Sequence, residues 1–264
     1  MDSICPVSDF VSVAGIRLEY AWHGPQPQAA PTLVFLHEGL GSIGQWRDFP
    51  AALTSRTGFG ALVYSRRGHG FSEPLDAPLP IRFMHDEALT VLPALLAHFQ
   101  INRPILIGHS TGASIGLIYA GSGAGQPLGV VVEAPHVFVE DTTVRRIAEL
   151  KTIYPESDLR RKLARHHGNV DAVFGSWTDI WLHRGFSTWN IAEYLPRVAC
   201  PVLVIQGLQD EYGTTKQVDA IVSGLNSRCE SLVLDHCGHA PHFDQREIVE
   251  TAVVEFVRRL GARE

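Results

Sequence analysis

Short apolar runs alternate with helix-length segments along most of the chain, and this rhythm restricts its possible folds more than any other feature. The runs are rich in Val, Ile, Leu and Phe, and Gly, Pro or His residues bound them. Near-continuous apolar runs of this length are typical of strands buried on both faces of a parallel sheet. Their alternation with helices predicts a doubly wound α/β core. The expected strands span residues 32–36, 60–64, 104–107, 129–132, 201–205 and 231–234.

Helix-length segments separate these strands, and an antiparallel pair precedes them. Residues 10–13 and 17–21 flank an Ala-Gly pair, and side chains alternate in the second run, so we expect a hairpin. Pro93 lies inside one helical segment and predicts a kink or a break at Leu92, because proline cannot donate the backbone hydrogen bond of a helix interior. The expected helices span residues 45–56, 83–99, 111–120, 216–223 and 244–260.

The rhythm fails in one long stretch, which predicts a helical insertion. Residues 135–195 contain no convincing buried strand but several charged, helix-prone segments. We therefore expect an α/β core made of residues 1–134 and 196–264, with residues 135–195 laid over it as a cap, or lid. The expected helices of the cap span residues 141–153, 159–167 and 170–183.

The cap carries three of the five tryptophans of the chain. Aromatic residues at helical spacing pack a lid onto its core more often than they line a pocket, but both roles are met if the lid roofs a cleft. The candidate pocket residues are Phe174, Trp177, Trp181 and Trp189.

Composition excludes several partner classes. The chain has 264 residues, a formal charge of -6 and no long Lys/Arg run, which disfavours nucleic acid and anionic membranes as partners. The N-terminus lacks the basic and apolar regions of a signal peptide, and no segment approaches the roughly 18 apolar residues of a membrane span. We therefore expect a cytoplasmic protein that acts on a small, neutral or apolar molecule. Its oligomeric state cannot be read from the sequence.

Cysteine and histidine spacing favours free thiols and no metal. The four cysteines form no C-x-x-C pair in a chain too large to need disulfides. His236, Cys237, His239 and His242 lie close together, but a tetrahedral zinc site usually needs a second ligand pair at a suitable spacing. We expect neither a metal nor an organic cofactor.

The sequence G-x-S-x-G ends the third expected strand and leads into a helix. Gly108 and Gly112 flank His109, Ser110 and Thr111. A serine hydroxyl is a weak nucleophile, so an enzyme holds it on a sharp strand-to-helix turn beside a base and oxyanion donors. Glycines let the backbone make that turn without Cβ clashes. Ser110 is therefore the candidate nucleophile.

A nucleophilic serine needs a base that titrates near neutral pH, and His239 is the best candidate. It follows the last expected strand, so it lies at the carboxyl edge of the sheet, as the nucleophile does. Gly238 makes the backbone permissive there. His236 and His242 are the competing candidates, whereas the turn would point His109 away from the nucleophile, in a structural role.

The base needs a carboxylate to hold its tautomer, and Asp210 follows the fifth expected strand at the same edge. A loop aspartate is usually a turn or cap residue, but this position favours a catalytic role. Glu211 is an adjacent alternative, and Glu133 and Asp141 are weaker ones after an earlier strand. Nucleophile, acid and base follow one another in the order expected for such a fold.

An oxyanion hole requires backbone N–H groups that point at the reacting carbonyl. The loop after the first core strand contains Glu38 and Gly39, and Thr111 follows the nucleophile, so these three residues are the candidate donors. Losing one such donor typically costs about 2.7–4 kcal/mol of barrier. The glycines of this loop could instead serve only a tight turn.

Taken together, these motifs resemble the α/β-hydrolase superfamily, in its capped, serine esterase-like branch. The resemblance covers nearly the whole chain and implies a mostly parallel sheet flanked by helices, with an inserted helical cap. It also implies a two-step acyl transfer by a Ser-His-Asp triad. The tryptophan-rich lid and the modest charge of the chain favour a small, largely apolar or aromatic ester. The motifs that carry the resemblance are 37–39, 67–72, 108–112, 207–210 and 238–239.

The chain departs from the family pattern at two positions. Glu38 stands where glycine is common, which leaves open which N–H completes the oxyanion hole; Gly39 is favoured. Ser65-Arg66 replaces an aspartate that often precedes the R-G-x-G motif, and Arg66 serves either a structural role or as a cation near the site.

Fold and triad do not set the substrate. A carbon–carbon bond hydrolase, a thioesterase, a cofactor-free lyase, a haloperoxidase-like enzyme and a non-turnover small-molecule receptor remain alternatives to an esterase.

Overall fold

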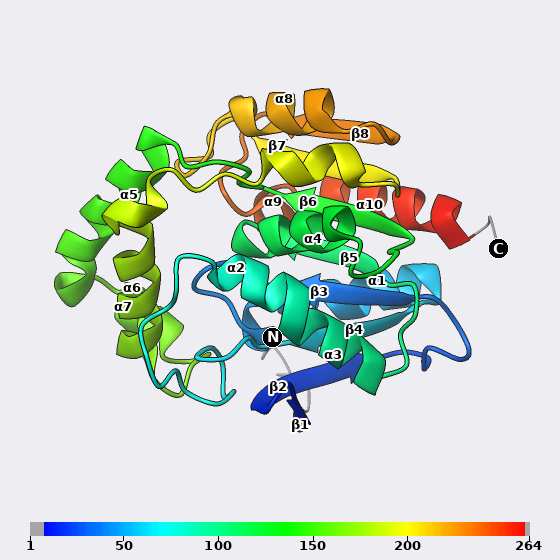
Figure 1. Ribbon diagram of the computed structural model, residues 1–264, viewed down its shortest axis with the longest axis horizontal. Coiled ribbons are helices and arrows are strands. Elements are labelled where there is room, and N and C mark those ends of the chain that lie inside the picture. The colour runs from blue at the N-terminus through cyan, green and yellow to red at the C-terminus, as the bar shows by residue number, and fades with distance from the viewer. Residues whose placement is uncertain (1–7, 262–264) are drawn as a thin grey trace.

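The apolar runs assemble into one eight-stranded sheet in the computed structural model, which describes residues 8–261 (Figure 1). The strand order is β1-β2-β4-β3-β5-β6-β7-β8. Only the β1–β2 and β2–β4 pairs are antiparallel, so the predicted hairpin and the predicted parallel sheet are both confirmed. The strands are β1 (Asp9–Val13), β2 (Ile16–His23), β3 (Thr32–Leu36), β4 (Gly60–Tyr64), β5 (Ile105–His109), β6 (Gly129–Glu133), β7 (Val202–Gly207) and β8 (Cys229–Leu234).

Most differences from the predicted strands lie at polar ends. β5 continues to His109 and β6 to Glu133, two buried polar residues that an apolar run does not include. β8 begins at Cys229, two residues before the predicted start, and most of its side chains are partly or fully exposed. An edge strand of this kind has a weak apolar pattern because it is not buried on both faces.

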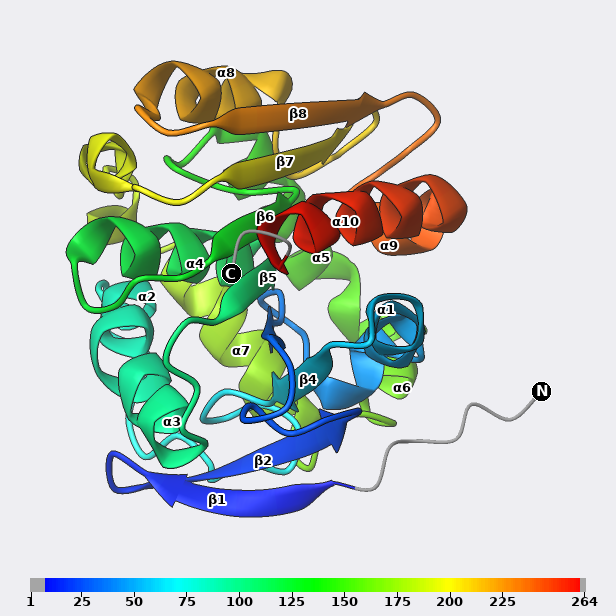
Figure 2. The same cartoon turned by 90° about the vertical axis from the view of Figure 1, so that its right-hand side faces the viewer.

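Helices cover both faces of the sheet, as predicted for the fold class (Figure 2). On one face, α1 (Phe49–Thr57) packs against α10 (Arg246–Gly261), which follows the short α9 (Pro241–Asp244). The other face carries α4 (Thr111–Ser122), α8 (Thr215–Gly224) and the run from α2 to α3. Each face has its own core of fully buried aliphatic and aromatic side chains.

The helical run around Pro93 is irregular where the sequence predicts it. It begins as α2 (Phe83–Asp86), widens into the π-helical segment η2 (Glu87–Val91) and continues as α3 (Leu92–His98). A π-helical turn is a common way to accommodate a disrupted backbone ladder. The helix therefore changes its winding before Leu92 and continues through the proline.

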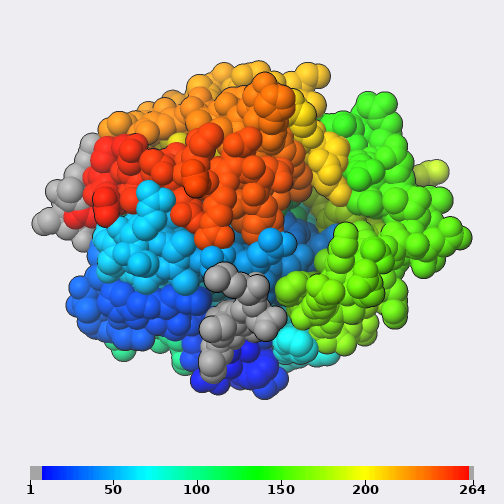
Figure 3. Space-filling model, turned by 180° about the vertical axis from the view of Figure 1, so that it is seen from behind, coloured from blue at the N-terminus to red at the C-terminus, as the bar shows by residue number. Residues whose placement is uncertain are grey.

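Residues 135–195 contribute helices and no strand to the described sheet. They form a lobe at one end of the sheet in Figure 1, and the surface is hollowed where this lobe meets the core in Figure 3. The boundaries of the cap at 134/135 and 195/196 stay a prediction. The helices of this region are α5 (Asp141–Ile153), η3 (Tyr154–Glu156), α6 (Leu159–Leu163), α7 (Val170–Trp181), η4 (Arg184–Phe186) and η5 (Ala192–Arg197).

One cap helix is shorter than predicted. α6 ends at Leu163, whereas the sequence predicts a helix through residue 167. The chain turns there because His167 contacts the core: its Nε2 donates to the Leu40 carbonyl at 2.8 Å, and its Nδ1 accepts from the Gly70 N–H at 2.9 Å. A tertiary contact therefore overrides the local helical preference.

Three of the four cysteines lie in the described region, and all three are free thiols: Cys200, Cys229 and Cys237. Cys5 and the N-terminal segment that the signal-peptide analysis concerns lie outside the described residues. Within residues 8–261, no helix combines the length and the apolar character that crossing a membrane requires.

Candidate active site

Ser110 lies on a strained turn between β5 and α4. Its backbone has φ 52 and ψ -115, a conformation that residues with side chains rarely adopt and that is typical of a nucleophile elbow. The flanking glycines are required by space. A Cβ at Gly108 would lie 2.5 Å from the Gly112 carbonyl oxygen, and a Cβ at Gly112 would lie 1.9 Å from the Leu36 carbonyl oxygen.

His239 and Asp210 form a close pair beside this turn. The Nδ1 of His239 lies 2.9 Å from each carboxylate oxygen of Asp210. Burial alone would lower the pKa of His239, but the Asp210 carboxylate outweighs it and raises that pKa above its ordinary value. Burial would raise the pKa of Asp210, but the charge and hydrogen bond of His239 lower it to about 2. The pair therefore fixes the proton on Nδ1 and leaves Nε2 free to accept one.

The chain holds the Asp210 carboxylate in place with donors of its own. Oδ1 accepts from the backbone N–H groups of Tyr212, at 2.8 Å, and Gly213, at 3.2 Å. Oδ2 accepts from Nε2 of Gln206 at 2.8 Å. Gln206 is a polar residue near the end of an otherwise apolar strand, a position in the sequence that could have identified it as a partner of the acid.

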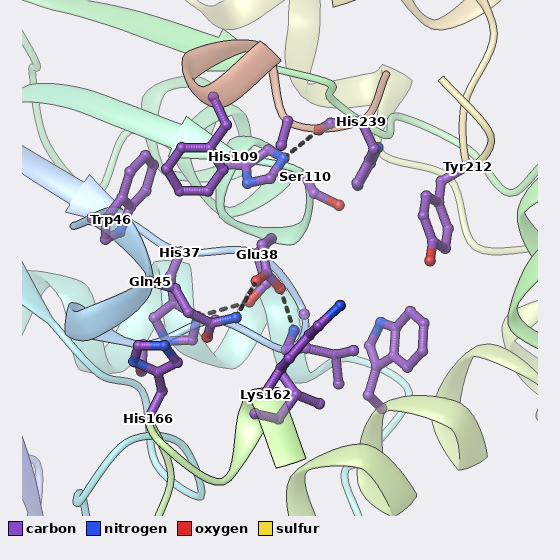
Figure 4. A pocket seen from close by; sticks show the side chains of 18 of the residues that line it. His37, Glu38, Gln45, Trp46, His109, Ser110, Lys162, His166, Tyr212 and His239 are labelled. Atoms are coloured by element: carbon purple, nitrogen blue, oxygen red, sulfur yellow. Dashed lines mark hydrogen bonds between the residues drawn. The ribbon is translucent and has the colours of Figure 1, made fainter. Parts of the chain in front are cut away.

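Ser110 and His239 face the same cavity (Figure 4). No hydrogen bond joins their side chains in the described structure. Such contacts are often loose before substrate binds, so the geometry is compatible with a nucleophile and base that meet during the reaction.

The competing histidines have other partners. The side chain of His236 is 89% exposed and lies beside Asp235, which removes it from the cavity. His242 donates from Nδ1 to the Glu133 carboxylate at 2.7 Å, so these two alternative candidates form a second, fully buried pair. The four residues of the possible zinc cluster therefore point to different partners.

His109 has the structural role that the sequence analysis expects. Its Nε2 donates to the His239 carbonyl oxygen at 2.6 Å, and its ring lies 5.1 Å from that of His242. Burial lowers the pKa of His109 well below its ordinary value, and the neighbouring histidines add to this effect. A neutral His109 thus ties the loop of His239 to β5.

Side chains from two other segments bind the carbonyl groups of the loop after β3. Arg66 donates to the carbonyls of His37 and Glu38. The Nε2 of His69 donates to the Gly39 carbonyl at 3.0 Å, and the Nε2 of His167 donates to the Leu40 carbonyl. The N–H groups of Leu40 and Gly41 bind Glu38 within the loop, whereas the loop itself does not use those of Glu38 and Gly39.

This loop meets the start of α4 at Gly39. A Cβ there would lie 3.4 Å from Oγ1 of Thr111 and 2.4 Å from the Trp177 ring. The backbone N–H groups of Glu38, Gly39 and Thr111 have no acceptor in the part of the chain that the structure describes. Gly39 and Thr111 thus lie beside the nucleophile with free donors, and the Glu38 N–H of the same loop is also free.

The two departures from the family pattern lie together. Arg66 is buried, its guanidinium donates to two carbonyls of the loop, and its backbone N–H donates to Nε2 of His37, which supports its structural role. The Glu38 carboxylate accepts from the Leu40 N–H and, at 3.4 Å, from the Gln45 amide. Burial raises the pKa of Glu38, although the Leu40 hydrogen bond and the Arg66 charge oppose this effect.

Comparison with known proteins agrees with this architecture. The model of the Alpha/beta hydrolase family matches residues 33–252. The chain belongs to this family of enzymes.

Individual relatives of this α/β hydrolase are distant. It is 28% identical to a 2-succinyl-6-hydroxy-2,4-cyclohexadiene-1-carboxylate synthase of Salmonella paratyphi A over 60% of this chain and only 57% of that protein. It is 25% identical to the human serine hydrolase BPHL over 76% of this chain and 69% of that protein. A solved structure from a report on carboxylesterases of Nitrososphaera gargenis has a TM-score of 0.78 at 18% identity, covering 97% of this chain and 100% of that one, which shows the shared fold alone.

The cavity of this α/β hydrolase measures about 500 Å³ and lies between core and cap. Trp177 and Trp181 line it, as predicted. The prediction is wrong for Phe174 and Trp189, which do not line the cavity. Phe174 stacks on Tyr154 with ring centroids 3.6 Å apart, and Trp189 stacks on Phe186 at 5.4 Å. Helical spacing cannot separate the aromatic residues that face the cavity from those that pack the cap itself.

The sequence analysis missed several residues of the cavity. Tyr212 lies 4.6 Å from the His239 ring, and buried His136 lies 5.9 Å from it. Both follow strand ends, a position that could have identified them. The cap also contributes Lys162 and Arg165, which the sequence pattern alone shows only as charged residues of a solvated helix.

Proposed function

We propose that this α/β hydrolase is a serine hydrolase that cleaves a small carboxylic ester. Ser110 is the nucleophile, His239 the base and Asp210 the acid that orients the base. The observation that carries the proposal is the bidentate His239–Asp210 contact, which opens into the same cavity as a serine on a strained elbow. A paired histidine and aspartate, a serine on a strained backbone and a cavity that both reach are expected of a catalytic site. A purely structural turn requires none of them.

The reaction proceeds in two acyl transfers. Ser110 Oγ attacks the ester carbonyl while Nε2 of His239 takes its proton, and the resulting tetrahedral oxyanion collapses to an acyl-enzyme. The same proton goes to the departing alkoxide, which leaves as the alcohol. A water then attacks the acyl carbon and gives one proton to Nε2 of His239. As the bond between the acyl carbon and Ser110 Oγ breaks, His239 returns this proton to Oγ, which releases the carboxylic acid and restores the serine hydroxyl.

The free N–H groups of Gly39 and Thr111 are the proposed oxyanion donors. Arg66 and His69 bind carbonyls of the loop and fix its backbone, so the donors need no reorganisation when charge develops on the substrate oxygen. Preorganised donors of this kind are usually the largest single source of transition-state stabilisation.

The cavity suits a small organic substrate. Its volume of about 500 Å³ lies within the usual range for small-molecule sites, and tryptophans of the proposed cap form part of its wall. Residues 135–195 act as the lid in this proposal. Apolar or aromatic groups of the ester would pack against Trp177 and Trp181, and the steps above use only side chains and backbone of this chain.

A substrate screen tests the proposal. Wild type and Ser110→Ala are assayed with 4-nitrophenyl esters, with thioesters, and with vinylogous diketones that report carbon–carbon bond cleavage. Wild type is expected to turn over the esters, and Ser110→Ala to lower kcat by roughly 10⁶-fold. Full activity in Ser110→Ala would refute the covalent mechanism, and turnover confined to thioesters or diketones would replace the ester assignment.

The choice of base has a matched test. His239→Ala should abolish most of the activity, whereas His236→Ala changes an exposed histidine three residues away and should retain it. Circular dichroism shows whether both variants are folded. Equal losses in the two variants would overturn the assignment of His239.

A further inference from the structure

Three cations line the cavity without an acidic partner. Arg47 comes from the loop before α1, and Lys162 and Arg165 come from α6 and the turn after it. No carboxylate lies within ion-pair distance of any of them in residues 8–261. The chain as a whole has a formal charge of -6, so an unneutralised positive cluster at one cavity wall is a local feature.

The acids closest to these cations in sequence are already paired with other arginines. Asp158 binds Arg161 at 3.1 Å and Asp171 binds Arg160 at 2.8 Å. The carboxylate of the residue after Arg47 likewise binds an arginine of α10 at 2.7 Å. The surrounding surface is thus neutralised pair by pair, whereas the cavity wall keeps its positive charge.

The positions of these side chains are specific. Figure 4 shows Lys162 entering the cavity from the cap side, with its amine nitrogen directed toward the space in front of Ser110. Arg47 has φ 52 and ψ -128, a strained conformation for a residue with a side chain. Its guanidinium lies 4.4 Å from the ring centroid of Phe243, another residue of the cavity wall.

The pKa of His166 reflects the positive charge at this wall of the cavity. Burial lowers its pKa, and the charges of Arg47 and Arg165 lower it further. The cap and the loop before α1 meet at this histidine, since a Cβ at Gly44 would lie 2.6 Å from its Nδ1. The cations of the two segments therefore surround one part of the cavity.

We propose that the substrate carries a carboxylate away from its ester group, and that Lys162 binds it with Arg165 and Arg47. This inference rests on the proposed esterase function and narrows its substrate class. Ser110 and the oxyanion donors would engage the ester carbonyl on the core side, while the cations of the opposite wall hold the charged end. The apolar or aromatic part of the substrate lies between them.

Glu38 does not cancel this positive wall. Its carboxyl group already accepts from the Leu40 N–H and the Gln45 amide, and neither oxygen contacts a cation of the wall. Hydrogen bonds from Lys or Arg to a carboxylate are among the stronger ones in proteins. The cluster therefore favours an anionic substrate over a neutral one of the same size.

Two pairs of matched esters test the inference. The first compares the mono-4-nitrophenyl ester of adipic acid with 4-nitrophenyl hexanoate, which has a methyl group in place of the carboxylate. The second compares the butanoate ester of 3-hydroxybenzoate with that of 3-methylphenol, which places the charge on the alcohol side. We expect wild type to prefer the charged member of one pair by about tenfold in kcat/KM, which corresponds to about 1.4 kcal/mol.

Variants assign this preference to the wall. Lys162→Gln should remove most of it, and Arg165→Gln and Arg47→Gln part of it. Arg161→Gln is the matched control, because it removes the same charge from the same helix at a residue that binds Asp158 and does not line the cavity. High salt should also weaken the preference, since these cations are exposed to solvent.

Calorimetric binding of adipate and of 3-hydroxybenzoate to Ser110→Ala tests the wall without turnover. Binding that Lys162→Gln weakens in this background supports the anion site even if no ester is hydrolysed, an outcome that would refute only the proposed function. Turnover of the neutral esters without preference for either charged ester would overturn the anion site and leave the proposed function intact. Equal loss of preference in Arg161→Gln and Lys162→Gln would also overturn it.

Discussion

Asp210→Asn is the sharpest perturbation of the proposed mechanism, because the structure dictates how the new amide must lie. Besides Nδ1 of His239, which lies 2.9 Å from both oxygens, Oδ1 of Asp210 accepts from two backbone N–H groups and Oδ2 accepts from the Gln206 amide. The oxygen of an asparagine would therefore occupy the first site and its NH₂ group the second. Gln206 can turn to accept from it, since its own Oε1 is buried without a partner.

That NH₂ group would lie about where Oδ2 is now, 2.9 Å from Nδ1 of His239. Where Asp210 offers Nδ1 two acceptors, the asparagine would offer it one acceptor, in the first site, and one donor. Donation from the NH₂ group to Nδ1 stabilises the imidazole with its proton on Nε2, which is the wrong tautomer for a base that faces Ser110. In a comparable triad the same change lowers kcat by about 10⁴-fold, and we expect a loss of that order here.

The pH dependence should change as well. In wild type, kcat/KM should rise with pH through the pKa of His239, which lies above the ordinary 6.5, because only the neutral ring accepts a proton. Without the Asp210 charge the imidazolium loses its counter-ion, so this limb should move to lower pH in Asp210→Asn. The same pairing lowers the pKa of Asp210 to about 2 although burial opposes this change, so the carboxylate stays charged throughout the range in which His239 titrates.

The assay measures kcat/KM for a 4-nitrophenyl ester from about pH 5 to about pH 9, a range that brackets the ordinary histidine pKa of about 6.5. Asp235→Asn is the control, because it removes an exposed carboxylate beside His236 and should leave the profile unchanged. Activity of Asp210→Asn within about tenfold of wild type would refute this reasoning, given the loss of about 10⁴-fold expected. An unshifted acidic limb would refute it too.

Three further perturbations test other parts of the site. Gly112→Ala places a Cβ 1.9 Å from a β3 carbonyl oxygen, whereas a Cβ in Gly116→Ala lies 3.5 Å from its nearest neighbour. Thermal unfolding should show that the first variant loses about 4 kcal/mol or more of stability and that the second loses none. Equal Tm values for the two variants would contradict this packing argument. Glu133→Gln should lower the free energy of unfolding in urea by about 1–3 kcal/mol. The amide oxygen can replace Oε2 as the acceptor for His242, but the NH₂ group would lie at Oε1, which is buried without a partner. An unchanged denaturation midpoint would show that the charge of the pair is dispensable. Arg66→Gln should lower kcat by about 10–100-fold with little change in KM, because the oxyanion loop loses its support; steady-state kinetics that show only a raised KM would assign Arg66 to substrate binding.

The local sequence pattern predicted most of the fold. Differences in burial explain why some predicted element bounds are correct and others are wrong. β3 and β4 have the predicted bounds because every residue in them is buried and apolar. β8 begins before its predicted start because its outer residues face solvent. α6 ends early because His167 bonds the core, and no local pattern contains that contact.

Chain order predicted the candidate triad better than it predicted the surroundings. A serine, an acid and a histidine after successive strands must meet at one edge of a parallel sheet. Chain order does not predict the partner of each histidine. Glu133 and His242, for example, are brought together only by the three-dimensional fold. The same holds for Lys162, whose position in the cavity depends on how the cap lies on the core.

Labelling with a fluorophosphonate followed by peptide mapping tests the central claim most directly. The probe reacts with a serine only where a base and oxyanion donors activate it. If Ser110 is the nucleophile and His239 its base, one label is expected on Ser110. It should be lost in Ser110→Ala and strongly reduced in His239→Ala. A label on another residue, or undiminished labelling of Ser110→Ala, would contradict this assignment.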